Sequence, residues 1–184
     1  QGIDFKELYD YRELTWVLDL KEIKIRYKQT LIGGSWAIIV PLVTMLIFTV
    51  FFGQMLDVPS DGVPYPIFSY SGLLLWTYFT TSMTISSNSL VTNAHLVTKV
   101  YFPRLIIPIS STLVGILDYT IASIVLFGLM VNYNLFPSLS ILLLPVILFF
   151  TWMLATGIGF WLSAIMVKYR DVKFIVPFFT SLFI

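Results

Sequence analysis

A face of polar side chains within an otherwise apolar stretch has the clearest capacity for chemistry in this chain. Residues 66–91 are rich in Ser, Thr and Asn, and at spacings of four, three and four they contain Thr77, Thr81, Thr84 and Asn88. Residues at these spacings share one face of an α-helix. On a water-facing wall, their hydroxyl and amide groups would form exchangeable hydrogen bonds with a hydroxyl-rich solute such as a sugar. The alternative is that they are satisfied against neighbouring helices.

Aromatic side chains near this face would add flat surfaces for the C–H faces of pyranose rings. The candidates in the first two apolar segments are Phe48, Phe52, Trp76 and Tyr78. Aromatic rings also face lipid or form belts at the membrane interface, and that alternative stays open for each of them.

Motifs for catalysis and for metal or nucleotide binding are absent from the sequence. There is no Cys, no GxxxxGK[ST] loop, no GxSxG and no HExxH, and His95 stands without a nearby acidic cluster. The chain is therefore predicted not to be an enzyme, with no catalytic residue, no metal site and no cofactor of its own. Asp118 lies in an apolar stretch, where an acid is by default a functional hypothesis. We interpret it as structural, and a proton-driven carrier or ion channel is the alternative that it supports.

The composition indicates a membrane protein. Hydrophobic residues make up 58% of the 184 residues and charged residues 11%, whereas soluble domains have about 45–50% and about 25%. A single apolar core cannot hide this much hydrophobic surface. No basic arm with interleaved aromatic residues is present, which argues against nucleic-acid binding.

The basic residues set the orientation of the chain. All 11 Lys and Arg fall within residues 6–28, 99–104 and 168–173. Basic residues concentrate in cytoplasmic loops, so these three clusters and the N-terminus are predicted to be cytosolic. The charged first thirty residues contain no apolar signal-peptide core.

The apolar segments predict an all-α polytopic fold in a single domain. Complete spans are expected at residues 31–56, 66–91, 105–131 and 139–167, and a fifth hydrophobic segment at 174–184 is too short to cross. We expect the chain to be a fragment of a longer protein. Within the fourth span, small residues spaced four apart would let a neighbouring helix approach closely; they are Ala155, Gly159 and Ser163.

Residues 4–30 are predicted to form an amphipathic helix on the cytosolic face of the membrane. Its basic face carries Lys21, Lys24 and Lys28, which would meet anionic lipid or a partner protein. A solvated helix leading into the first span is the alternative.

Four short sequence blocks resemble the permeases of type-2 ABC exporters. They are residues 26–33 (RYKQTLIG) with Trp36 and Pro41, residues 72–74 (GLL) with Trp76, residues 88–91 (NSLV) followed by 93–104 (NAHLVTKVYFPR), and residues 169–172 (YRDV). The third block is similar to the loop between spans two and three in the branch that exports bacterial surface polysaccharides, such as O-antigen, capsule and teichoic acid.

The resemblance implies a six-span subunit of the bacterial inner membrane that forms a homodimer. Two separate ATPase subunits, which bind ATP and Mg²⁺, would sit beneath the pair. The implied cargo is a polyprenyl-linked polysaccharide that passes through a channel at the dimer interface. Two alternatives stay open: the cargo is a drug or a lipid, or the chain is a membrane anchor or scaffold without a transport path.

The segment 93–104 is the candidate for coupling to the ATPase. A short amphipathic helix with apolar side chains to bury and basic residues to pair would suit a cleft on a soluble subunit, and Pro103 would end it. The coupling candidates are Leu96, Val97, Lys99, Val100, Tyr101, Phe102 and Arg104. Lys21, Lys24 and Lys28 are a possible second contact. The alternative is a loop whose basic residues only anchor the topology.

Overall fold

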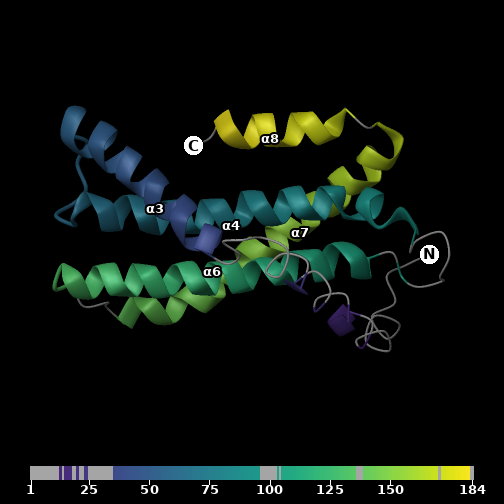
Figure 1. Ribbon diagram of the computed structural model, residues 1–184, viewed down its shortest axis with the longest axis horizontal. Helices are drawn as coiled ribbons and strands as arrows, with labels where there is room; N and C mark the ends of the chain where they lie inside the picture. The colour runs from purple at the N-terminus through teal and green to yellow at the C-terminus, as the bar shows by residue number, and fades with distance from the viewer. Residues whose placement is uncertain are drawn as a thin grey trace.

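The chain is described by a computed structural model that covers residues 13, 15–17, 20, 23–24, 35–95, 103, 105–135, 139–169 and 171–182. Every element assigned within these residues is a helix, which confirms the predicted all-α class. The elements are α3 (Trp36–Phe48), a π-helix η2 (Thr49–Met55), α4 (Tyr65–Thr92), α6 (Ile106–Asn132), a 3-10 helix η3 (Leu139–Leu143), α7 (Leu144–Lys168) and α8 (Val172–Leu182). Figure 1 shows α4, α6 and α8 lying along the long axis of the molecule, with α3 and α7 running obliquely to them.

Three helical stretches of the described chain are long and apolar enough to cross a membrane. They are Ile38–Met55, Ile106–Asn132 and Ile141–Lys168, which correspond to the first, third and fourth predicted spans. The helix at the second predicted span, α4, has 28 residues and is long enough, but it is not among the three because its Ser, Thr and Asn residues lower its hydropathy. Length and composition alone therefore do not identify α4 as a span.

Neighbouring helices surround this polar helix. The most extensive contacts of α4 are with α7 and α6, and it also packs against α3 and α8. In Figure 1, α4 and α6 lie side by side, α3 crosses one end of α4, and α8 runs along its upper side. The position of α4 explains its composition, since hydroxyl groups can hydrogen-bond to the backbone of their own helix while small side chains allow close packing.

Two apolar clusters hold the helices together. The larger one joins α3, α4 and α6 and includes Met45, Tyr70 and Tyr119. Tyr70 is fully buried, and its hydroxyl donates to the carbonyl oxygen of Ala122 at 3.1 Å. The smaller cluster joins α4, α7 and α8.

Tight turns connect the helices at one end of the molecule. Asp57, Asp61 and Asn134 have φ values of 49°, 49° and 55°, a backbone conformation in which Asp and Asn are enriched among non-glycine residues. A Cβ added to Gly53 in η2 would lie 2.8 Å from Cγ of Tyr65, so glycine is needed for the π-helix to meet the start of α4. The Lys168 end of α7 and the start of α8 lie at the opposite end (Figure 1).

Candidate functional site

The predicted polar stripe lies on a half-buried face of α4. All four residues, Thr77, Thr81, Thr84 and Asn88, have intermediate exposure. Thr84 Oγ1 donates to the carbonyl oxygen of Thr80 at 2.7 Å, and Asn88 Nδ2 donates to that of Thr84 at 2.8 Å. These bonds use the hydroxyl proton of Thr84 but leave lone pairs on Thr84 Oγ1 and on the side-chain carbonyl of Asn88. The face can therefore accept hydrogen bonds from a hydroxyl-bearing ligand.

The opposite face of α4 packs closely against α6 and α7. Ser82 and Ser86 are completely buried and lie roughly 150° around the helix from the stripe. A Cβ placed on Gly159 of α7 would collide with both Cβ and Oγ of Ser86. A Cβ on Gly115 of α6 would lie 3.1 Å from Ser82 Oγ. Glycines therefore let α4 approach α7 on one side and α6 on the other.

The three small residues of α7 lie on the helix face that meets α4. Ala155 is 0% exposed and Ser163 is 1% exposed, and Gly159 is buried between them. The sequence interpretation did not include their counterparts on α4. A signal for them was present, because Ser82 and Ser86 are also small residues spaced four apart.

A second contact that the sequence did not reveal is a polar cluster between α6 and α7. Trp152 Nε1 donates to Thr112 Oγ1 at 3.0 Å. Thr112 Oγ1 also lies 3.2 Å from Thr156 Oγ1, and Thr156 Oγ1 donates to the carbonyl oxygen of Trp152 at 2.7 Å. Thr112 is fully buried, so this cluster fixes the relative position of the two helices.

The aromatic candidates do not gather on the polar stripe. Tyr78 was predicted as a possible channel-lining residue, but it is 4% exposed and its ring contacts Tyr119 on α6 with centroids 5.6 Å apart. The structure corrects that interpretation, because Tyr78 points toward the buried face of α4. Phe48 and Phe52 pair with each other, with centroids 5.1 Å apart.

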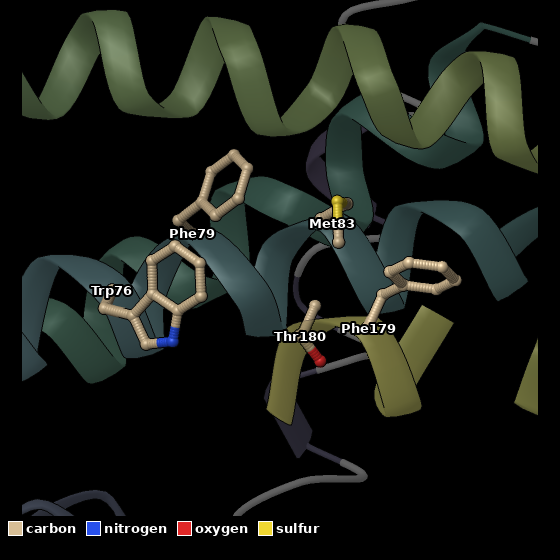
Figure 2. A pocket seen from close by; sticks show the side chains of 5 residues that line it. All are labelled: Trp76, Phe79, Met83, Phe179 and Thr180. Carbon is tan, nitrogen blue, oxygen red and sulfur yellow. The ribbon is translucent and has the colours of Figure 1, made fainter. Parts of the chain in front are cut away.

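Trp76 also lies away from the stripe, against Phe79 at a centroid distance of 5.8 Å. Both rings line a groove between α4 and α8, together with Met83, Phe179 and Thr180 (Figure 2). The groove was not foreseen from the sequence.

The predicted coupling residues lie outside the described part of the chain. This applies to Leu96, Val97, Lys99, Val100, Tyr101, Phe102 and Arg104, and also to Lys21 and Lys28. Lys24 is described and exposed. Among the described elements, α4 ends at Thr92 and α6 begins at Ile106 at the same end of the bundle (Figure 1). That end also contains the exposed Lys168.

Two further sequence expectations concern acidic residues and metal ions. Asp118 is half-buried on α6. Within the described residues, no group of three or more His, Cys, Asp or Glu side chains is arranged to hold a metal ion.

Comparison with known proteins gives consistent matches over most of the chain. The ABC-2 type transporter family model matches residues 13–184. A protein from Myxococcus xanthus named O-antigen export system permease protein RfbA is 28% identical over 172 residues, which are 93% of this chain and 65% of the relative. A protein of the same name from Klebsiella pneumoniae is 30% identical over 162 residues, 88% of this chain and 62% of the relative. The chain thus spans less than two thirds of the length of these relatives.

Proposed function

The chain belongs to the ABC-2 type transporter family, and on that premise we propose that it is the membrane-spanning subunit of an ATP-driven exporter. Its cargo would be a polyprenyl-linked, O-antigen-like polysaccharide, moved from the cytosol across the bacterial inner membrane. The observation that carries the proposal is the similarity to relatives named as O-antigen export permeases over 88–93% of the chain. The drug, lipid and scaffold alternatives have no comparable support.

The polar face of α4 supports a hydroxyl-rich cargo. Thr77, Thr81, Thr84 and Asn88 form a stripe that neither α6 nor α7 covers completely. A polysaccharide offers many hydroxyl donors, and the lone pairs of this stripe would accept them in exchangeable hydrogen bonds. No single bond needs to be strong, since a moving cargo must leave each site as easily as it enters. We propose that this stripe lines the export path.

The exporter would contain two copies of this subunit and two ATPase subunits that bind ATP and Mg²⁺. The end of the bundle where α4 ends, α6 begins and Lys168 lies would face the cytosol, together with the N-terminus, because basic residues concentrate on that side. The coupling residues Tyr101 and Phe102 would then meet the ATPase.

The assembly is tested by purifying the full-length protein in a mild detergent and identifying what accompanies it. The proposal expects a stoichiometric ATPase subunit whose hydrolysis depends on the permease, together with a polyprenyl-linked glycan. Homogeneous protein without an ATPase would contradict the exporter assignment. A bound ATPase with a different cargo would contradict only the polysaccharide.

The stripe is tested separately by measuring export. Replacing Thr84 with Val and Asn88 with Leu removes two acceptors while keeping similar volumes, and we expect export to fall while the protein still folds. Ser71→Ala is the matched control, because Ser71 is an exposed hydroxyl on α4 outside the stripe. Equal export by all three variants would exclude the stripe from the path.

A further inference from the structure

The groove between α4 and α8 has the character of a lipid-binding site. Trp76, Phe79 and Met83 form its α4 side, and Phe179 and Thr180 form its α8 side (Figure 2). Thr180 Oγ1 donates to the carbonyl oxygen of Pro177 at 2.9 Å, so its hydroxyl is already satisfied. The lining is apolar, and the volume is about 280 Å³. An apolar lining offers water no hydrogen-bond partners, so the groove favours hydrocarbon.

The groove begins in the inner half of the hydrocarbon core. Met83 and Trp76 lie nine and sixteen residues before the end of α4 at Thr92. At the helical rise these positions are about 14 Å and about 24 Å from that end. Half of the hydrocarbon core is about 15 Å thick. α4 is about 42 Å long, close to the thickness of about 40–45 Å of a bilayer with its headgroups, so its cytosolic end lies about 6 Å outside the hydrocarbon core. Met83 is then about 8 Å and Trp76 about 18 Å inside that core, so the groove runs from the inner half of the bilayer to just beyond its middle.

A positive charge stands above the groove on the same side of α8. Lys173 precedes Thr180 by seven residues, which is two helical turns and about 10 Å along the axis. Lys173 is exposed, and so is the nearby Asp171. Asp171 lies in the turn that precedes α8, one residue before the helix begins at Val172. Exposed Lys168, whose Nζ lies 5.3 Å from the centroid of the Tyr169 ring, adds charge at the same end.

We propose that this groove binds one acyl chain of an anionic glycerophospholipid from the cytosolic leaflet, with the lipid phosphate at Lys173. The apolar lining selects hydrocarbon, and the basic residue about one headgroup layer above it selects a negative headgroup. A basic residue near the membrane surface favours anionic lipid by about 1 kcal/mol, which is about fivefold in affinity. The bound lipid fills the space between α8 and the α4–α6–α7 bundle.

The groove contains its own reporter, because Trp76 fluorescence is quenched by brominated acyl chains that touch the ring. The full-length protein is reconstituted in phosphatidylcholine vesicles that contain either brominated phosphatidylglycerol or brominated phosphatidylcholine. The fluorescence of Trp76 is obtained by subtracting the emission of a Trp76→Phe variant from that of the parent protein. Trp161 on α7, which is 69% exposed, provides the matched control through Trp161→Phe.

We expect Trp76 to be half-quenched at an about fivefold lower fraction of the brominated anionic lipid than of the neutral one. Trp161 should respond equally to both lipids. Lys173→Gln should abolish the preference at Trp76, and Lys173→Arg should keep it. A Phe179→Trp reporter in the Trp76→Phe background should reproduce the preference from the α8 side.

Two results would overturn the proposal. Equal quenching of Trp76 by both lipids would mean that the ring meets only bulk acyl chains. No quenching would mean that protein fills the groove, either another segment of the full-length chain or a second copy. The measurement requires neither transport nor ATP, so its failure is distinguishable from failure of the proposed export function.

Discussion

Replacing Gly159 with Ala tests how closely α4 and α7 approach each other. A Cβ at this position would collide with the Cβ of Ser86 as well as with its Oγ. Rotating the Ser86 side chain moves Oγ but leaves Cβ in place, so the two helices must separate. Forcing an extra methyl group into a packed interface costs about 1–3 kcal/mol. Replacing a helical glycine with alanine offsets about 0.5–1 kcal/mol of that cost.

Gly157 on the same helix provides the matched control. Nothing lies within 4 Å of a Cβ added there. Gly157→Ala should therefore only gain the stability that alanine gives a helix relative to glycine. The free energy of unfolding, measured by titrating mixed micelles with SDS, should therefore be lower for Gly159→Ala than for Gly157→Ala by about 1–3 kcal/mol. Gly115→Ala should fall between them, because the nearest contacts of its Cβ, Ser82 Oγ at 3.1 Å and Tyr78 Cε2 at 3.3 Å, are longer than those at Gly159.

A double-mutant cycle identifies the partner of Gly159. Adding Ser86→Gly to Gly159→Ala removes both colliding atoms, so the double variant should be more stable than the sum of the single changes by about 1–3 kcal/mol. Equal stability of Gly159→Ala and Gly157→Ala would refute the close approach. If the two changes in the free energy of unfolding simply add, the destabilisation by Gly159→Ala does not arise from a contact with Ser86.

Three further changes test other parts of the chain. Thr112→Val keeps the side-chain volume but removes the acceptor for Trp152 Nε1. It should lower the free energy of unfolding by about 0.6–1.7 kcal/mol and shift the fluorescence emission of Trp152. An unchanged emission would contradict the hydrogen bond. Replacing Tyr101 and Phe102 together with Ala should leave membrane insertion intact while reducing cargo export and ATPase stimulation, and normal export would remove the coupling assignment. Asp118→Asn should preserve export if the carboxyl group is structural, whereas loss of export by a folded variant would place Asp118 in the path.

Much of the helical architecture was predictable because membrane insertion depends on local sequence. The stretches at 105–131 and 139–167 correspond closely to α6 (Ile106–Asn132) and to η3 with α7 (Leu139–Lys168). A run of about twenty apolar residues forms a helix in lipid whatever its neighbours, since each backbone group must be bonded within its own segment. The distribution of Lys and Arg is likewise local information.

The candidate site was only partly predictable, because the environment of a helix face depends on distant segments. Helical spacing placed Thr77, Thr81, Thr84 and Asn88 together on one face of α4, and the structure has them at intermediate exposure. The same reasoning could not show that Tyr78 faces α6, since aromatic rings suit a channel, a lipid surface or a protein core equally well.

The sequence by itself determined which segments are helical, which of them are apolar, and that Thr77, Thr81, Thr84 and Asn88 share one face of α4. Only the tertiary structure decided which α4 side chains meet Gly115 and Gly159, and that a groove remains between α4 and α8. The physical reason is that hydropathy and helical periodicity depend only on residues that are close together in the sequence. A collision between Ser86 and a side chain at position 159, or a gap between Trp76 and Phe179, exists only after helices far apart in the chain have packed together.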